Sequence, residues 1–287
     1  MNDLQNRIEA LATSGRLPDG TPYRRISVED VVRLSTEFGV PGRDVEIAAL
    51  KTGATPERYV RNMKTFSLEE QIILLSSRVC IVGLGGLGGA VTEILARVGI
   101  GTLRLIDGDI FEDSNLNRQF LSTPDRIATS KAAAAAQRVR QINSSIVVQQ
   151  YDENLNDSNS LSLIENSDVA IDCLDNVPAR FSLERASKQI GSPLVSAAVA
   201  GVSGHVTTIF PEDPGLELIY GGSFGRPQKG VETSLGCLPQ AVTLLASVEC
   251  SEVIKILLGK GELLRDKLFF IDLVSNTMDI LQLLKPS

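Results

Sequence analysis

The stretch that decides the fold is RVCIVGLGGLGGAVTEILARVGIGTLRLID, residues 78–107. It contains a short apolar run that ends at a glycine, a helix-forming segment over about 87–98, and a second apolar run over 102–107. The turn between the first run and the helix has the pattern G-x-G-x-x-G, made by Gly83, Gly85 and Gly88, with a further glycine, Gly86, inside it. Glycines permit a tight turn, and the free N–H groups at a helix N-terminus can bind phosphate oxygens. The stretch therefore predicts the first strand, phosphate loop and helix of a nucleotide-binding fold.

The alternation of strands and helices continues toward the C-terminus. A strong helix former occupies residues 131–143, DVAIDCLD over 168–175 is predicted as a buried strand, and a helix is predicted over about 239–259. Residues 267–283 are typical of a terminal strand hairpin. We therefore expect an α/β fold, with a Rossmann-like, mainly parallel sheet that has helices on both faces. The long irregular connection over 211–236 is of a kind that is usually functional.

Residues 1–76 have a different pattern, and we assign them to an N-terminal helical region that precedes a nucleotide-binding domain over 77–287. Its predicted helix caps are Ser27, Thr55 and Ser67. Residues 28–52 have the spacing of a helix-turn-helix, but the second helix would carry Asp44 and Glu46 where a recognition helix faces phosphates. We therefore expect packing helices and no nucleic-acid partner.

Composition and charge narrow the class of protein. The 287 residues are 43% hydrophobic and have a formal net charge of −7, a composition typical of soluble globular proteins. An acidic chain is a poor non-specific ligand of nucleic acids and anionic membranes. The polar N-terminus lacks a signal sequence, and no apolar run is long enough to span a bilayer. We therefore predict a cytoplasmic protein with no membrane partner.

The cysteines and the single histidine exclude several kinds of site. None of the four cysteines belongs to a C-x-x-C pair, so neither a structural zinc nor a secretory disulfide framework is expected. His205 lies in an apolar segment and is predicted to be structural. Cys80, Cys173 and Cys250 are predicted to lie in the core.

Polar side chains follow the predicted strands. Asp107 comes 19 residues after Gly88, where a carboxylate can accept hydrogen bonds from ribose hydroxyls. The loops and the next helix add Asn115, Arg118, Gln119 and Lys131, and Asp175 is expected at the end of the strand over 168–175. Carboxyl ends of parallel strands meet at one sheet edge, where ligands bind. Two cations and a carboxylate suit a triphosphate with Mg²⁺, with Arg118 and Lys131 neutralising charge and Asp175 holding the metal.

Four stretches give the chain a resemblance to the ThiF/MoeB/HesA family, the bacterial relatives of ubiquitin-activating enzymes. They are SRVCIVGLGGLGGAVTEILARVGIGTLRLIDGDIFEDSNLNRQFL, SKAAAAAQRVRQIN, DCLDNVPARF and, more weakly, LGCLPQAVTLLASVECSEVIKILLG, and they span about 78–259. The resemblance implies an adenylyltransferase that uses ATP to adenylate the C-terminal glycine of a small ubiquitin-like sulfur carrier ending in Gly-Gly. It also implies pyrophosphate as the product.

The same resemblance implies roles for individual residues. Asp107 would bind the ribose and Asp175 the Mg²⁺. The phosphate ligands would be Asn115, Arg118, Gln119 and Lys131. Asp109 and Asn176 join the glycine loop among the predicted cofactor-binding residues.

Two further residues are candidates for the chemistry. Many family members have an R-Y-x-R segment that lends an arginine to the partner subunit of a homodimer. Arg58-Tyr59-Val60-Arg61 resembles that segment, which makes Arg61 the candidate. Cys237 stands just before a proline-initiated helix, where a thiol pKa can fall. It is therefore a possible acceptor of the activated carrier, although a small packing residue is the favoured interpretation.

Other functions remain open on the sequence. The same fold could activate another carboxylate, on a peptide or on a modified tRNA, as a related dehydratase branch does. A non-catalytic nucleotide-binding scaffold and a dinucleotide oxidoreductase are further alternatives. Selection of ATP–Mg²⁺ over NAD separates adenylation from the last of these.

Overall fold

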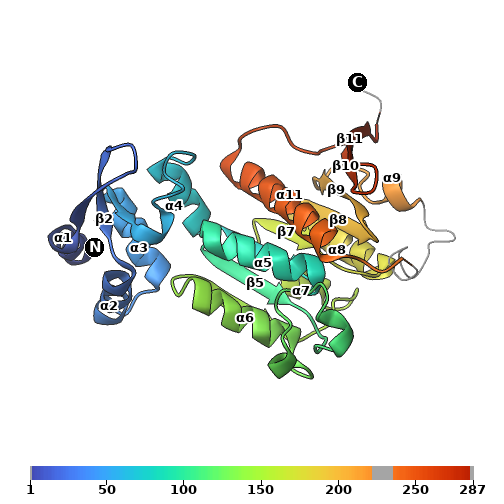
Figure 1. The fold of residues 1–287 in the computed structure, drawn as a ribbon, viewed down its shortest axis with the longest axis horizontal. Helices are drawn as coiled ribbons and strands as arrows, with labels where there is room; N and C mark the ends of the chain where they lie inside the picture. Colours follow the sequence, from blue (N-terminus) through green and yellow to red (C-terminus); the bar gives the residue numbers. More distant parts are fainter. Residues whose placement is uncertain (1, 222–234, 285–287) are drawn as a thin grey trace.

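A large sheet forms the centre of the molecule in the computed structural model, which describes residues 2–221 and 235–284 (Figure 1). Its strands are β4 (Arg78–Val82), β5 (Thr102–Ile106), β6 (Val147–Tyr151), β7 (Val169–Asp172), β8 (Leu194–Ala200), β9 (Ser203–Ile209), β10 (Lys267–Asp272) and β11 (Thr277–Gln282). Their order across the sheet is β11-β10-β9-β8-β7-β4-β5-β6. Neighbouring strands are parallel from β6 to β8 and antiparallel from β8 to β11. This confirms the mainly parallel α/β sheet and the C-terminal hairpin.

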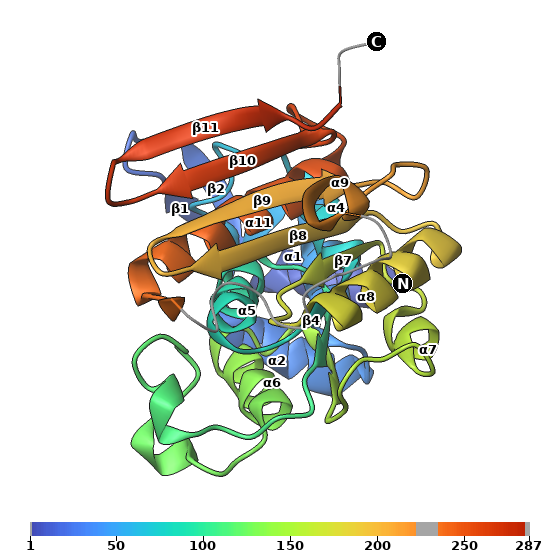
Figure 2. The same ribbon diagram turned by 90° about the vertical axis from the view of Figure 1, so that its right-hand side faces the viewer.

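Helices cover both faces of the parallel part (Figure 2). One face packs on α5 (Gly86–Val98), α6 (Lys131–Ile142) and α11 (Pro239–Leu258), and the other on α7 (Ser160–Ile164) and α8 (Val177–Ile190). In β4, Val79 and Ile81 join the first core, while Cys80 and Val82 join the second. Because both faces of the strand are buried, its sequence is an unbroken apolar run.

The N-terminal region is not wholly helical, and that prediction is wrong. It contains α1 (Asn2–Leu11), β1 (Thr13–Arg16), β2 (Pro22–Ile26), α2 (Val28–Phe38), α3 (Gly42–Lys51), β3 (Ala54–Pro56), a 3₁₀ turn (Glu57–Tyr59) and α4 (Leu68–Ser76). The strands form a separate small sheet. Its β1–β2 turn is closed by hydrogen bonds from Gly20 to Leu17 and from Leu17 to Thr21, over the turn-forming sequence Pro-Asp-Gly.

The predicted caps of this region have different outcomes. Ser27 caps α2 and Ser67 forms a capping box with Glu70 at α4, as expected. Thr55 does not cap a helix, because it lies in β3 beside β2. Only one 3₁₀ turn follows Pro56. A short β pairing therefore replaces the predicted helix start.

A buried set of polar residues, which we call the junction cluster, fastens the N-terminal region to the sheet domain. Its members are Glu46, Arg58, Tyr59 and Asn143. The Tyr59 hydroxyl donates to Glu46 (3.1 Å) and accepts from the Asn143 amide (2.8 Å), while Arg58 donates to Asn143 and lies 3.1 Å from Glu46. Burial raises the pKa of Glu46, although the charge of Arg58 opposes that shift. Glu46 therefore points into the protein at the end of α6.

The connection predicted over 211–236 includes the short helix α9 (Glu217–Tyr220), and residues 222–234 lie outside the described part of the chain. None of the helices in the described ranges combines the length and hydropathy that a membrane span requires.

Candidate active site

The main cavity lies at the carboxyl ends of β4, β5 and β7 and has a volume of about 710 Å³. The predicted site residues that line it are Gly83, Gly85, Gly86, Asp107, Asp109, Arg118, Gln119, Lys131, Asp175, Asn176 and Cys237. Three other candidates, Gly88, Asn115 and Arg61, are not among its lining residues. Segments far apart in sequence thus meet where ligands bind in parallel sheets.

Two glycines show why the turn after β4 excludes other residues. Gly83 has a φ of +87°, and a Cβ there would lie 2.6 Å from the carbonyl oxygen of Cys173. A Cβ at Gly88 would lie 1.7 Å from the carbonyl oxygen of Gly83. Gly88 therefore serves the close packing of α5 against the turn, which differs from the predicted ligand contact.

Asp107 ties the end of β5 to the glycine loop. Its carboxylate accepts hydrogen bonds from the backbone N–H of Leu84 (2.6 Å) and of Asp109 (2.8 Å). Burial raises the pKa of this carboxyl, and the two backbone hydrogen bonds and the charge of Lys131 oppose the shift. The same carboxylate has lone pairs left for a ligand hydroxyl, so the predicted ribose contact remains compatible with its structural role.

Lys131 is the most deeply placed cation that we predicted for the site. Its side chain is only 10% exposed, and the ammonium lies 3.0 Å from the carboxylate of Asp109, which is 58% exposed. A second bond joins the two segments, from the Lys131 backbone N–H to the Asp109 carbonyl oxygen (3.0 Å). The pair holds the lysine at the wall of the cavity, with the carboxylate on the solvent side.

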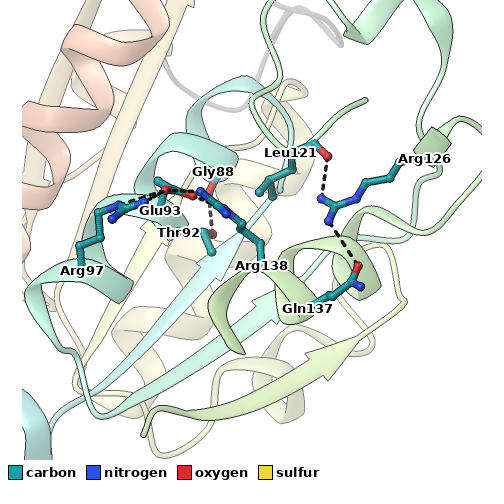
Figure 3. Close-up of polar contacts among 8 residues, drawn as sticks. All are labelled: Gly88, Thr92, Glu93, Arg97, Leu121, Arg126, Gln137 and Arg138. Atoms are coloured by element: carbon teal, nitrogen blue, oxygen red, sulfur yellow. Dashed lines mark hydrogen bonds and ion pairs between the residues drawn. The ribbon is translucent and has the colours of Figure 1, made fainter. Parts of the chain in front are cut away.

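Ion pairs hold the helix of the glycine loop against the helix that begins at Lys131 (Figure 3). Glu93 of α5 accepts from Arg138 of α6 at 2.7 and 2.8 Å, and it also pairs with Arg97. Arg126, in the segment that leads into α6, donates to the Leu121 carbonyl oxygen (3.1 Å) and to Gln137. The spacing between the glycine loop and Lys131 is therefore fixed by contacts outside the cavity.

Gln119 is a buried side chain with unused hydrogen-bonding capacity. It is 6% exposed, its amide lies beside Gly85, and its Oε1 has no hydrogen-bond partner among the described residues. A buried acceptor without a donor costs free energy unless a ligand or water satisfies it. A ribose hydroxyl and an adenine amino group are donors of the right kind, so the cavity fits a nucleotide.

The two other polar residues predicted in this segment differ in position. Asn115 is buried, and its side chain accepts from the Glu112 backbone N–H (3.1 Å), so it shapes the turn and does not face the cavity. Arg118 lines the cavity, half-buried, and donates to the Ser114 carbonyl oxygen (2.9 Å). Of the two, Arg118 has the position for a phosphate contact.

Strand β7 ends at Asp172, three residues earlier than predicted, so Asp175 lies in the loop after it. Asp175 is exposed on the cavity wall and makes no hydrogen bond or ion pair that we find in the described part of the chain. Asn176 caps α8 by accepting from the Ala179 backbone N–H (2.9 Å). The amide is thus already used, while the carboxylate beside it is available to a ligand.

Sequence analysis assigned no site role to a second, mainly buried polar set, the floor cluster, although three of its members lie in the stretch DCLDNVPARF. It consists of Asp172, Cys173, Arg180 and Glu249, of which Cys173 and Arg180 line the cavity. Arg180 donates to Asp172 (2.8 Å), and the Cys173 sulfur lies 4.0 Å from Glu249. Burial, and then the charge of Asp172, raise the pKa of Glu249, and one of its oxygens has no partner among the described residues. The available signal was the presence of charged residues inside apolar segments.

The remaining candidates lie at different depths. Cys237 lines the cavity and packs on the larger core, while its neighbours Leu235 and Leu238 are 63% and 44% exposed. Arg61 is exposed in the segment after the junction cluster. His205 is half-buried on β9, and desolvation lowers its pKa to about 4.

The donors at the cavity suit Mg²⁺ bound together with phosphates. No group of three or more potential metal-ligating side chains occurs in the ranges that the structure describes. Mg²⁺ is commonly held by one or two carboxylates plus substrate phosphates, so Asp175 alone is compatible with it.

Comparison with known proteins identifies relatives by sequence. The model of the ThiF family matches residues 59–287. The SAMP-activating enzyme E1 of Haloferax volcanii is 35% identical over 231 residues, which cover 78% of this chain and 83% of that protein. The adenylyltransferase and sulfurtransferase MOCS3 of Arabidopsis thaliana is 33% identical, over 82% of this chain but only 52% of the relative. The chain thus spans about half of the MOCS3 proteins.

Solved structures show the same fold. E. coli MccB with succinimide has a TM-score of 0.68 at 22% identity, covering 79% of this chain and 70% of that one. E. coli tRNA N6-threonylcarbamoyladenosine dehydratase, TcdA, in complex with ATP has a TM-score of 0.60 at 23% identity, covering 71% and 94%. At these identities the likeness concerns the fold alone.

Proposed function

Because this chain belongs to the ThiF family, we propose that it is an ATP-dependent adenylyltransferase acting on a small ubiquitin-like sulfur carrier. Its substrate is the carboxylate of a C-terminal Gly-Gly, and its products are the carrier acyl-adenylate and pyrophosphate. The sequence relatives named SAMP-activating enzyme E1 and MOCS3 support this substrate class over the other carboxylates.

The observation that carries the proposal is the set of groups at the main cavity. The glycine loop leads into the N-terminus of α5, and Lys131 is held in the wall of the cavity. The side-chain oxygen of Gln119 has no hydrogen-bond donor among the described residues. N–H groups and cations suit phosphates, whereas an amide acceptor suits a hydroxyl or amino group. These requirements coincide in ATP.

The chemistry needs charge stabilisation more than proton transfer. A carboxylate oxygen of the carrier attacks the α-phosphorus, and the bond from that phosphorus to the β-bridging oxygen breaks. Arg118 and Lys131 offset the negative charge that grows on the departing pyrophosphate. Mg²⁺, held by Asp175, would supply further charge neutralisation. The nucleophile is already ionised, so no general base is required, in keeping with a single histidine of low pKa.

We assign Arg61 to the cavity of a partner subunit in a homodimer. It is exposed and does not line the cavity of its own chain. Its neighbours Arg58 and Tyr59 are fixed in the junction cluster, which gives the segment a rigid base. A cytoplasmic location accords with the unbridged Cys80, Cys173 and Cys250, since a reducing compartment maintains thiols.

The test is ATP–pyrophosphate exchange with a purified carrier ending in Gly-Gly. Exchange should require the carrier and should vanish when the carrier's last glycine is deleted. Exchange that ignores the carrier but responds to a short peptide or to a modified tRNA would replace the proposed substrate with one of those carboxylates. ATP binding with no exchange toward any carboxylate would indicate a scaffold.

A further inference from the structure

Arg180 of α8 lines the main cavity, yet its guanidinium is directed into the protein. One terminal nitrogen donates to Asp172 (2.8 Å) and to the Ala197 carbonyl oxygen (2.8 Å), and the other donates to the Leu174 carbonyl oxygen. Asp172 is fully buried and also accepts from Ser196 (2.7 Å). The charge of Arg180 is therefore compensated within the protein, which leaves it poorly suited to bind phosphates directly.

These contacts immobilise the loop after β7 at nearly every residue. The Cys173 N–H donates to the Val82 carbonyl oxygen (2.9 Å), and the Leu174 N–H donates to Asp172 (3.1 Å). With the Leu174 carbonyl held by Arg180 and Asn176 engaged as the cap of α8, Asp175 stands between two anchored residues. Its exposed carboxylate is the part of the loop that remains for a ligand.

We propose that Arg180 is a positioning residue that sets the Asp175 carboxylate for Mg²⁺ by pinning the Leu174 carbonyl oxygen and the Asp172 carboxylate. The planar fork of arginine is needed, because one side chain must reach β7, β8 and the loop at once. A lysine preserves the positive charge but cannot reproduce that set of directed bonds. This inference rests on the proposed nucleotide site and adds to it a residue that contacts neither substrate nor metal.

The experiment measures how ATP raises the melting temperature of the full chain during a Mg²⁺ titration, without any carrier. In Arg180→Lys, the half-saturating Mg²⁺ concentration should rise about tenfold, the usual order for losing a residue that orients a metal ligand. The stabilisation by ATP alone, in the presence of EDTA, should stay as in the unaltered protein. Arg185→Lys, on the same helix but exposed and paired with Asp157, is the matched control and should change nothing.

A double-variant comparison separates positioning from general damage. If Arg180 acts through Asp175, adding Arg180→Lys to Asp175→Asn should give no further increase in the Mg²⁺ requirement beyond Asp175→Asn alone. Should Arg180→Lys fail to fold, Asp172→Asn removes the main anchor of Arg180 and should raise the Mg²⁺ requirement in the same direction. Additive shifts, or an unchanged Mg²⁺ curve in the variant that folds, would overturn the positioning role.

Failure of the positioning role can be distinguished from failure of the proposed function. A protein that binds Mg²⁺–ATP with the expected Arg180 dependence but exchanges no pyrophosphate would retain the positioning role and lose the carrier chemistry. A chain that ATP does not stabilise at any Mg²⁺ concentration would overturn both.

Discussion

The junction cluster and the floor cluster each bury a carboxylate that is not fully satisfied, yet they differ in purpose. Glu46 of the junction cluster has Arg58 at 3.1 Å and Tyr59 as a donor, and no member of that cluster lines the main cavity. Within residues 2–221 and 235–284, Glu249 of the floor cluster has only a weak thiol contact, because Arg180 is engaged by Asp172. The junction cluster joins two parts of the chain, whereas the floor cluster supports the cavity. Substitutions in the junction cluster should therefore mainly affect the stability of the protein. Substitutions in the floor cluster should mainly affect ligand binding in the cavity.

The largest effect is expected in the cavity itself. Lys131→Ala and Arg118→Ala should each lower carrier-dependent pyrophosphate exchange by at least ~10²-fold, the order of one lost transition-state donor. Arg140→Ala, exposed on the same helix as Lys131, is the control and should exchange normally. Equal exchange rates in the two cavity variants and the control would remove these residues from the site.

Arg61 tests whether the N-terminal region contributes to chemistry as well as to assembly. Arg61→Ala and Lys131→Ala should each be inactive alone. Mixed and exchanged subunits should recover about a quarter of normal activity, because half the dimers then hold one intact site. No recovery, with subunit exchange demonstrated by differently tagged chains, would place Arg61 in its own subunit or outside the reaction.

A substitution in the junction cluster should have the opposite effect to one in the cavity, because it should lower stability and leave pyrophosphate exchange nearly unchanged. Tyr59→Phe removes the hydroxyl shared by Glu46 and Asn143 and should lower the free energy of unfolding by about 1–3 kcal/mol, the cost of stranding buried polar groups. Urea denaturation measures the loss. Exchange per folded molecule should stay close to normal. A variant of normal stability would show that the cluster does not fasten the two regions.

Glu249 gives the floor cluster a predicted pH signature. The pKa of Glu249 is raised in the folded protein. At a pH above the pKa of the unfolded state, the native state therefore binds more protons than the unfolded state, and the free energy of unfolding falls as the pH rises. The side chain in Glu249→Gln is neutral at every pH, so the variant lacks this contribution to the pH dependence of stability. The free energy of unfolding of Glu249→Gln, relative to that of the unaltered protein, should therefore increase as the pH rises from 5 to 8. Urea denaturation measures both values. A pH-independent difference would contradict a protonated Glu249.

The smallest effect is expected at Cys237. Cys237→Ala should leave pyrophosphate exchange within a few-fold of normal, because adenylation needs only the nucleotide site, and it should cost some stability through lost packing. Intact-protein mass spectrometry with carrier and ATP should show no covalent adduct. A carrier conjugate that forms on the unaltered protein and disappears in the variant would prove Cys237 to be an acceptor.

The sequence alone determined the features that local rules govern. The apolar runs and the glycine pattern predicted β4, α5 and β5 because a doubly covered strand and a tight phosphate turn permit few other residues. Ser67 and Glu70 predicted the start of α4, since a capping box is made within one turn. The order of polar residues after the strands predicted most of the cavity lining, because parallel strands share one carboxyl edge.

Only the tertiary structure decided which polar residues serve each other and which remain for a ligand. The β1–β2 hairpin and β3 were missed because their strands are short and stabilised by pairing across the N-terminal region. Asn115 and Gly88 matched the expected pattern but are used inside the fold, while Arg180 was given no role within the stretch DCLDNVPARF and supports the cavity. Hydrogen bonds and desolvation depend on neighbours far apart in the chain, and the sequence order does not encode their distances.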